Sequence, residues 1–376
     1  MNILIIGRGI PTEQNPKLGI FEMDQAKALA GIGNKVKYFA VDLRSIRKWR
    51  KWGLIKGESD GVKWYVYNLP VGPFPVRIRS MIGSAILKKM YDDIILKPPD
   101  VIHAHFTKIG HMALGIANKN GIPLIITEHS SEMNNDVIQD SVLKFAKVTY
   151  SGANQVIAVS KALSDNLKEK IGINCEVIPN IMGDWNFLNC KKIPHMGMGY
   201  LSICDLIEHK RPELLIRSFA WLTVRHDDVY LGIIGDGKQR RMLEILTADL
   251  GIKKKVKFYG KQTREQIAKI FRKYDCFVLP SIRETFGVAY IEAMSAGLPV
   301  IATKCGGPEE FVTKENGILI STDNGQELVN AMEEMYCNGK KYDSERISGF
   351  VQEHFSPDIV AERICSLYRK VINESM

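Results

Sequence analysis

The stretch RETFGVAYIEAMSAGLPVIATKCGG, residues 283–307, carries two glutamates, Glu284 and Glu292, in an apolar, small-residue setting. The preceding segment, 275–281, is apolar and strand-length. Residues 288–296 suit a helix that ends at Gly297 and Pro299, and VIAT (300–303) suits the next strand. A strand, a helix and a strand in this order build parallel sheets covered by helices. The stretch therefore predicts an α/β fold, with Glu284 in the loop at the carboxyl end of a strand.

The same alternation continues outward along the chain. We expect strands at 2–6, 35–41, 62–69, 99–106, 122–129 and 154–160 in the first half, and at 200–204, 229–237, 255–260, 275–281 and 298–304 in the second. Helices are expected at 21–33, at 161–170, where Ser160 is a good N-cap, and at 212–224.

A chain of 376 residues exceeds the size at which one core usually stops growing. We therefore predict two Rossmann-like domains with doubly wound parallel sheets, 1–180 and 195–355, joined by a linker over 181–199. A final helix within 356–376 is expected to pack back on the N-terminal domain. Two such domains facing each other would leave a central cleft at the carboxyl ends of their strands, where ligands of open α/β sheets bind.

Composition and hydropathy argue against several protein classes. The chain is 45% apolar and 25% charged, as in globular proteins, and its longest apolar runs are only strand-length, so no membrane span is expected. The N-terminus lacks a basic leader and a cleavage site, which indicates a first strand and a cytoplasmic protein. The seven cysteines are scattered, so we expect neither a disulfide framework nor a zinc site.

Positive charge is concentrated in one part of the chain. Residues 44–97 contain twelve Lys or Arg against four Asp or Glu. The core of this surplus is the basic stretch 44–56, RSIRKWRKWGLIK, and a second basic, apolar segment lies at 75–90. Such a pattern suits the headgroup region of an anionic bilayer, where each nearby cation contributes about 1 kcal/mol. A solvated loop with its two tryptophans in the core explains the pattern about equally well, and nucleic acid ranks well behind because no nucleic-acid-binding motif is found. The proposed membrane-facing residues are Arg47, Lys48, Trp49, Arg50, Lys51 and Trp52.

Two places in the second half suggest anion binding. The backbone N–H groups of Thr285, Phe286 and Gly287 open a helix and could hold a diphosphate, and Gly287 would let a ligand approach closely. Glu292 lies among alanines on a helix suited to close packing, where a carboxylate is unexpected unless it accepts hydrogen bonds from ligand hydroxyls. With Glu284 and Glu292 flanking the anion site, we expect a sugar at one end of the site and a ribose at the other. Lys210 and Arg211 precede Pro212 at a helix start, where the dipole disfavours cations and a bound diphosphate would offset them.

These motifs resemble the retaining glycosyltransferases of family 4. The run ETFGVAYIEAMSAGLPVIATKCGGPEE (284–310) has their signature of a glutamate, seven residues and a second glutamate, and GIIGDG (232–237), VKFYG (256–260), ANQVIAVSKAL (153–163), VIPN (177–180) and residues 11–29 are also similar. The resemblance covers nearly the whole chain and implies the GT-B fold. Two positions depart from the pattern, because Asp205 stands where the family has an arginine, and Arg211 replaces its usual glycine.

The resemblance also implies roles for individual residues. Glu284 would contact the donor sugar, Glu292 the ribose, and His129 the reacting groups. Further donor-binding positions would be Gly19, Lys210, Arg211, Gly235, Gly237 and the amides of 285–287. His105 (in HAHF, 103–106) is expected near the acceptor, and His103 is expected to be structural.

The implied reaction is transfer of a sugar from a UDP- or GDP-sugar with retention at the anomeric carbon. No Asp-x-Asp motif is present, so we expect no metal ion and no other cofactor. The acceptor would be a lipid-linked saccharide for a cell-surface glycan such as lipopolysaccharide or capsule, at the inner face of the plasma membrane. A soluble acceptor, a noncatalytic GT-B subunit suggested by Asp205, and a weaker option, a nucleotide-sugar epimerase, remain as alternatives.

Overall fold

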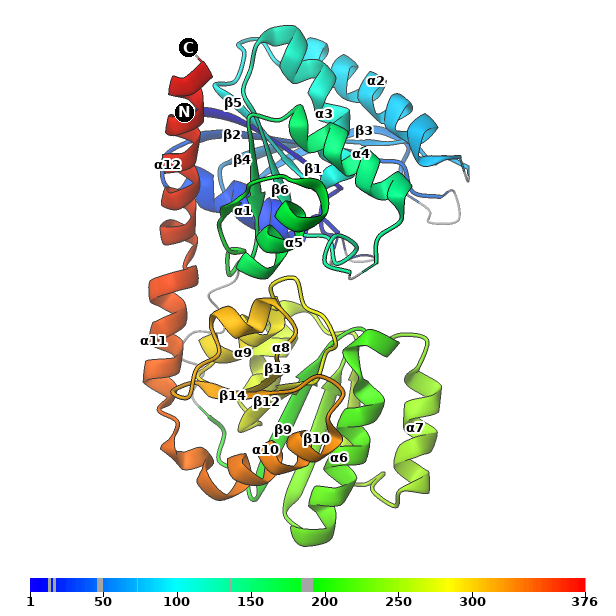
Figure 1. Cartoon of the computed structure of the whole chain (residues 1–376), viewed down its shortest axis with the longest axis vertical. Helices are drawn as coiled ribbons and strands as arrows, with labels where there is room; N and C mark the ends of the chain where they lie inside the picture. The colour runs from blue at the N-terminus through cyan, green and yellow to red at the C-terminus, as the bar shows by residue number, and fades with distance from the viewer. Residues whose placement is uncertain are drawn as a thin grey trace. The chain divides into compact units, whose positions relative to one another are not determined.

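The computed structural model describes the chain except residues 13–14, 16–17, 46–49, 73, 136, 184–191 and 376. It forms two compact units, Met1–Gly183 together with Phe355–Met376, and Asp184–His354. Each unit contains a sheet flanked by helices (Figure 1). The predicted two-domain α/β fold is therefore confirmed, and the last segment of the chain belongs to the first unit.

The first unit is built on an eight-stranded sheet of order β3-β4-β2-β1-β5-β6-β7-β8. Its strands are β1 (Asn2–Gly7), β2 (Lys35–Asp42), β3 (Gly53–Ser59), β4 (Val62–Asn68), β5 (Val101–His105), β6 (Leu124–Glu128), β7 (Gln155–Ala158) and β8 (Glu176–Val177). Its helices are α1 (Ile20–Gly31), α2 (Val76–Ile94), α3 (Thr107–Asn120), α4 (Asp140–Ser151), α5 (Lys161–Ile171) and α12 (Pro357–Ser375). The predicted cap of α5 is confirmed, because Ser160 Oγ accepts a hydrogen bond from Leu163 N.

One edge of this sheet departs from the predicted parallel arrangement. Strand β3 pairs antiparallel with β4, whereas the other pairs in this sheet are parallel. Asp60 and Gly61 join the two strands, and both have positive φ, 49° and 76°. An Asp-Gly pair with this geometry makes a two-residue turn whose twist matches a hairpin. Part of the basic stretch 44–56 is therefore an edge strand.

The second unit has a six-stranded, fully parallel sheet of order β11-β10-β9-β12-β13-β14. Its strands are β9 (Met198–Ile203), β10 (Val229–Ile234), β11 (Val256–Gly260), β12 (Cys276–Leu279), β13 (Val300–Thr303) and β14 (Gly317–Ile320). Its helices are α6 (Pro212–Arg225), α7 (Arg240–Asp249), α8 (Arg264–Phe271), α9 (Val288–Ser295), α10 (Gly325–Asn338) and α11 (Ser344–Phe355). Strands β12 and β13 are buried throughout, which explains their continuous apolar sequences.

The predicted linker, 181–199, is too long at both ends. Ile181 and Met182 are buried in the first unit, and Met182 N donates a hydrogen bond to Phe355 O. Met198 and Gly199 already belong to β9. Much of the interior of the predicted linker, 184–191, lies outside the described residues.

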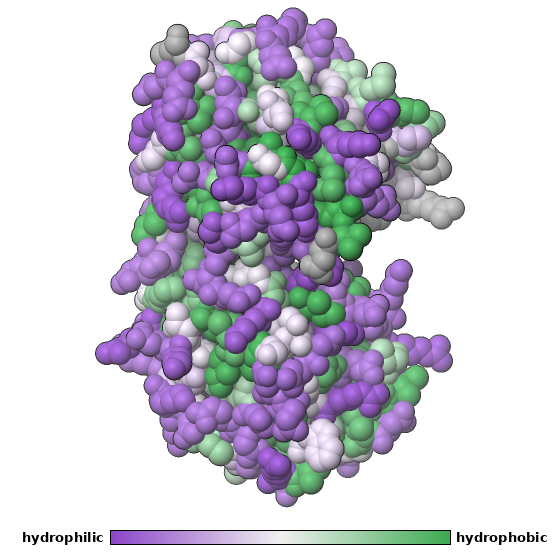
Figure 2. All heavy atoms as spheres, in the orientation of Figure 1, coloured by the Kyte–Doolittle hydropathy of each residue, from purple (hydrophilic) through white to green (hydrophobic). Residues whose placement is uncertain are grey.

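The described surface is mainly hydrophilic on the face shown in Figure 2, with small hydrophobic patches. None of the helices that the structure describes combines the length and the apolar character needed to cross a membrane. In each sheet, parallel strands bring the loops that follow them to one edge, and the candidate site residues lie in these loops.

Candidate donor and acceptor sites

Glu284 is the centre of the candidate donor site in the second unit. It lies in the loop after β12, is 8% exposed, and its Oε1 accepts hydrogen bonds from Lys210 Nζ (2.7 Å) and Ser281 Oγ (2.7 Å). The loop that carries Lys210 is tied to this loop, since Ile282 N donates to His209 O at 2.8 Å. The structure thus brings two predicted site residues, Lys210 and Glu284, into direct contact. The sequence reasoning missed Ser281, although it ends the predicted strand.

Charge at the start of α6 is balanced differently from the prediction. Arg211 is the N-cap, with a left-handed φ of 51°, and Pro212 begins the helix. Glu284 neutralises Lys210, and the Arg211 guanidinium pairs with Asp323. Carboxylates of the protein therefore already pair with both cations, and the binding of a diphosphate at this helix start stays a prediction. A ligand phosphate would have to share the cations with these carboxylates. Asp205, where the family has arginine, is exposed in the same loop.

The loops after β9 and β10 interlock through two glycines. Gly235 has a φ of 131°, and a Cβ there would lie 1.8 Å from Cys204 O. A Cβ on Gly237 would lie 2.4 Å from Leu206 O. Both predicted donor-binding glycines are thus required by packing between the loops, and their contact with a nucleotide stays a prediction.

The start of α9 offers backbone donors. Phe286 is 4% exposed and packs against Phe311, so its side chain belongs to the core. Gly287 is the N-cap, with a φ of 98°. The N–H groups of Thr285 and Gly287 have no hydrogen-bond acceptor within the described part of the chain. These donors and the positive end of the helix dipole favour an anion here.

Glu292 lies on α9, and its side chain is 14% exposed. Its Oε1 is 3.9 Å from Nε of Arg264, the first residue of α8, which the sequence reasoning did not single out. Within the described residues, no group of three or more His, Cys, Asp or Glu side chains is arranged to hold a metal ion. The expectation that the reaction needs no metal ion stays a prediction.

In the first unit, histidines stack at the carboxyl ends of β5 and β6. His105 Nδ1 lies 2.9 Å from His129 Nε2, and the His105 ring also stacks on His103, with centroids 4.7 Å apart. Phe106 and Phe21 lie beside the His129 ring, at centroid distances of 4.9 and 6.2 Å. His105 is completely buried, so the prediction that it contacts an acceptor is wrong, and it supports His129 instead.

Burial sets the charge of these histidines. It lowers the pKa of His129 to about 4, against the opposing effect of the Glu22 and Glu128 carboxylates. Burial also lowers the pKa of His103 to about 3 and depresses that of His105. All three rings are therefore neutral near pH 7. The His129 Nδ1 atom is buried, and a side-chain hydrogen bond with Asn180 partly offsets the effect of burial on the pKa of the ring.

Glu128 fixes the backbone around this stack, and sequence reasoning missed it. Its Oε1 accepts from the N–H groups of His129 (2.9 Å) and Ser130 (2.6 Å). Its Oε2 accepts from Thr107 N (3.0 Å), Thr107 Oγ1 (2.5 Å) and Tyr150 OH (2.5 Å). One buried carboxylate thus joins the start of α3, helix α4 and the loop of His129.

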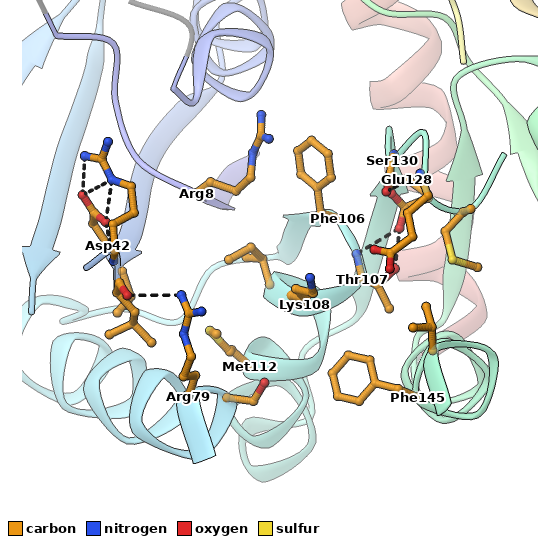
Figure 3. Close-up of a pocket in the computed structure, with 18 of the residues that line it drawn as sticks. Arg8, Asp42, Arg79, Phe106, Thr107, Lys108, Met112, Glu128, Ser130 and Phe145 are labelled. Carbon is orange, nitrogen blue, oxygen red and sulfur yellow. Dashed lines mark hydrogen bonds and ion pairs between the residues drawn. The ribbon is translucent and has the colours of Figure 1, made fainter. Parts of the chain in front are cut away.

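A cavity of about 420 Å³ opens beside Glu128 in the same unit (Figure 3). Its apolar wall includes Phe106, Met112 and Phe145. Four cationic side chains also line it, Arg8 just after β1, Arg44 just after β2, Arg79 on α2 and Lys108 on α3, together with the carboxylates of Asp42, Glu128 and Glu132. Arg8 pairs with Glu22, Arg44 pairs with Asp42, and Arg79 donates to Leu43 O, whereas Lys108 has no anionic partner among the described residues.

The basic stretch behaves differently from the membrane prediction. Arg50 is wrongly assigned to a bilayer, because its side chain is only 10% exposed and pairs with Asp42 at 2.8 Å. Lys51 and Trp52 are exposed, which also excludes Trp52 from the core. Arg47, Lys48 and Trp49 lie outside the described residues.

Gly19, predicted to approach donor phosphates, is the N-cap of α1, with a φ of 69°. A Cβ on this residue would lie 2.0 Å from Gly9 O. The close contact with Gly9 is sufficient to explain the glycine, and its contact with a donor stays a prediction.

Comparison with known proteins identifies the family. Residues 23–182 match Glycosyltransferase Family 4, and residues 191–347 match Glycosyl transferases group 1. One component of the human phosphatidylinositol N-acetylglucosaminyltransferase is 24% identical over 335 residues, which are 85% of this chain and 69% of the human protein.

Solved structures share the fold at low sequence identity. The sucrose-phosphate synthase of Thermosynechococcus elongatus superposes with a TM-score of 0.81 at 20% identity, covering 99% of both chains. HepE of Anabaena, solved in complex with UDP and glucose, gives 0.77 at 20% identity and covers 98% of this chain and all of that one. The chain therefore belongs to the family 4 glycosyltransferases and has their GT-B fold.

Proposed function

We propose that the protein is a retaining hexosyltransferase that moves a sugar from a UDP- or GDP-sugar to a lipid-linked saccharide, in the synthesis of a cell-surface polysaccharide such as lipopolysaccharide or capsule. The observation that carries the proposal is the buried Glu284, held by Lys210 and Ser281 beside the N–H groups that open α9. This arrangement places a carboxylate that can bind a sugar beside hydrogen-bond donors that can bind a diphosphate.

The leaving diphosphate would be stabilised by protein groups. The start of α9 supplies positive charge, and Lys210 would share its charge between Glu284 and the diphosphate, which suits the negative charge that develops as the glycosidic bond to phosphate breaks. Glu292 would accept from the ribose hydroxyls. We propose that no metal ion is required. The UDP in the HepE structure supports a uridine nucleotide as the first donor to try.

Retention would follow from substitution on one face of the sugar, with the leaving diphosphate assisting the acceptor hydroxyl. The protein would then contribute positioning and charge stabilisation, not a covalent intermediate. His129 fits such a role, because its neutral ring can hydrogen-bond a hydroxyl without adding charge.

The cavity in the first unit supports a lipid-linked acceptor. Lys108, which has no anionic partner among the described residues, suits a phosphate, and the apolar wall of the cavity suits the start of a hydrocarbon chain. Helix α2, which contributes Arg79, exposes Ile78 and Met81. We propose that this helix faces an anionic membrane at the cytoplasmic side. The name of the human relative, which refers to phosphatidylinositol, is compatible with an acceptor in a lipid layer.

Donor hydrolysis tests the reaction without knowledge of the acceptor. The purified protein would be incubated with UDP- and GDP-sugars in EDTA, and nucleotide release measured for the wild type, Glu284→Gln and Glu315→Gln. Glu315 is an exposed residue of the same unit and provides the matched control. We expect release from one donor, a loss of about 100-fold or more in Glu284→Gln, and no change in Glu315→Gln.

A noncatalytic subunit is the second candidate, because the exposed Asp205 replaces the family's arginine. Nucleotide binding without turnover, unchanged by Glu284→Gln, would support that candidate and contradict the transferase. An absolute need for a divalent cation would contradict the metal-independent mechanism alone. Transfer to a water-soluble acceptor with no effect of lipid would contradict the lipid-linked substrate.

A further inference from the structure

A second cavity, also of about 420 Å³, lies in the second unit and takes no part in the proposed reaction. Its wall includes Tyr230 near the start of β10, Lys257 near the start of β11, and Tyr274 just before β12. These are the amino ends of parallel strands. Glu284, Gly235 and Gly237 follow the carboxyl ends of the same sheet. The cavity is therefore at the opposite edge of the sheet from the candidate donor site.

We name this cavity the lysine–tyrosine groove. It is lined by Ile193, His195, Tyr230, Leu231, Lys254, Lys255, Lys257, Tyr259, Lys273 and Tyr274. Four of these residues are lysines and three are tyrosines, and the set contains no Asp or Glu. Such a lining favours an anionic ligand that has flat, partly apolar faces.

Most of the lysine charge is uncompensated. Lys255 is the exception, because its Nζ lies 3.6 Å from Asp227 Oδ1 and donates to Asp227 O. Lys254, Lys257 and Lys273 are exposed and have no anionic partner within the described ranges of the chain. The nearby Asp275 does not balance them, since it already pairs with Lys192 at 2.6 Å and accepts from Gly199 N.

The tyrosine rings are held in place by their hydroxyls. Tyr230 OH donates to Lys273 O at 2.7 Å, and the hydroxyls of Tyr259 and Tyr274 lie 3.0 Å apart. Two glycines in the sheet let rings lie close to the backbone. A Cβ on Gly199 would lie 2.6 Å from the Tyr230 ring, and a Cβ on Gly232 would lie 2.3 Å from Tyr274 OH. Tyr274 is buried beneath the groove and supports the partly exposed rings of Tyr230 and Tyr259, which form a fixed wall that costs a ligand little ordering entropy.

We propose that the lysine–tyrosine groove binds an acidic oligosaccharide, whose carboxylate or phosphate groups meet the lysines while its sugar rings lie against the partly exposed rings of Tyr230 and Tyr259. The choice of a saccharide rests on the proposed function, because a glycosyltransferase of cell-surface glycans meets such chains as substrate or product. A recessed groove cannot insert its rings into a bilayer, and its volume suits a ligand of a few rings. The groove would hold the glycan away from the reacting groups.

The test uses the full-length protein and tetragalacturonate as the probe, with neutral maltotetraose as the uncharged comparison. Binding is measured by isothermal titration for the wild type and for the groove triple variant Lys254→Gln/Lys257→Gln/Lys273→Gln. The control triple variant, Lys119→Gln/Lys168→Gln/Lys314→Gln, removes the same charge from exposed lysines elsewhere. We expect the groove variant to bind tetragalacturonate at least about 10-fold more weakly, and the control to change less than about 2-fold. Tyr259→Leu should also weaken binding.

Several results would overturn the proposal: equal weakening by both triple variants, no weakening by the groove variant, or equal binding of the neutral and acidic saccharides. Groove-dependent binding of an RNA oligonucleotide or of anionic vesicles, without binding of tetragalacturonate, would assign the groove to another partner. Donor hydrolysis measured on the same variants separates the two proposals. The groove variant should hydrolyse the donor normally, and loss of groove binding with intact hydrolysis would leave the proposed function standing.

Discussion

At the scale of single residues, Glu128 links three segments of the first unit through one carboxylate. All five of its partners are donors: two backbone N–H groups on Oε1, and one N–H and two hydroxyls on Oε2. A hydroxyl can rotate to accept a hydrogen bond, whereas a backbone N–H cannot. If an amide NH2 replaced either oxygen, it would face at least one backbone N–H group, and neither group could accept the other's hydrogen bond.

We predict that Glu128→Gln, although nearly isosteric, lowers the free energy of unfolding by about 3 kcal/mol. It should also reduce donor hydrolysis, because the His129 loop loses its anchor. Urea unfolding and turnover would be compared with Glu169→Gln, a change at an exposed glutamate of the same unit. A Glu128→Gln protein as stable as the control would show that the carboxylate charge is unnecessary.

His103 is a second residue with a measurable consequence. It is completely buried, with Thr127 Oγ1 2.6 Å from Nε2 and Tyr368 OH 2.5 Å from Nδ1, and burial lowers its pKa to about 3. In the unfolded chain its pKa is about 6.5. As the pH falls below about 6.5, His103 binds a proton in the unfolded state but not in the folded state, so the free energy of unfolding decreases.

For His103 alone, this loss of stability amounts to about 2 kcal/mol at pH 5. Unfolding free energies at pH 7.5 and pH 5 should therefore differ less in His103→Gln than in the wild type. The exposed His354→Gln serves as the control and should keep the wild-type difference. An undiminished pH dependence in His103→Gln would mean that this ring is protonated in the folded protein.

At the scale of elements, α2 separates a buried side from an exposed one. Leu87 and Met90 are buried, whereas Ile78 is 42% exposed and Met81 71% exposed. Exposed Arg77, Lys88 and Lys89 lie on the same helix. Apolar side chains flanked by cations favour the interface of an anionic bilayer.

We predict that Ile78→Ser/Met81→Ser lowers binding to vesicles containing anionic lipid by about 10-fold or more. Co-sedimentation at low and high salt would measure it, and salt should weaken wild-type binding. Val224→Ser/Ile245→Ser removes two exposed apolar side chains from the second unit and should have no effect. Equal binding by both double variants would argue against α2 as the membrane-facing element.

Elements were predictable where local sequence decides them. The buried strands β12 and β13 and the Ser160 cap follow from short patterns. The hairpin of β3 could have been predicted from Asp60-Gly61, a residue pair typical of two-residue hairpin turns. Pairings between distant residues could not be predicted. The partners of Arg50 and Glu128 depend on which strands become neighbours, and local sequence does not encode that.

At the scale of the whole molecule, the first unit is made from both ends of the chain. Helix α12 packs against α1 and buries Ile364, Tyr368 and Val371 in the core that includes Ile3 and Val36. Tyr368 also reaches His103, and Asn34 Nδ2 donates to Cys365 Sγ at 3.4 Å. The second unit, by contrast, is one continuous segment.

Because the last helix completes only the first unit, its removal should affect the two sheets unequally. We predict that truncation after Phe355 greatly increases amide hydrogen exchange in β1, β2 and β5, while β9, β10 and β12 keep their protection. Ile364→Asp should reproduce this pattern in the full chain, since it places a charge in the same core, and Glu362→Ala, a change at an exposed position of α12, should not. Uniform loss of protection in both sheets would show that the units unfold together. Unchanged protection of β1 would show that α12 contributes little to the core it covers.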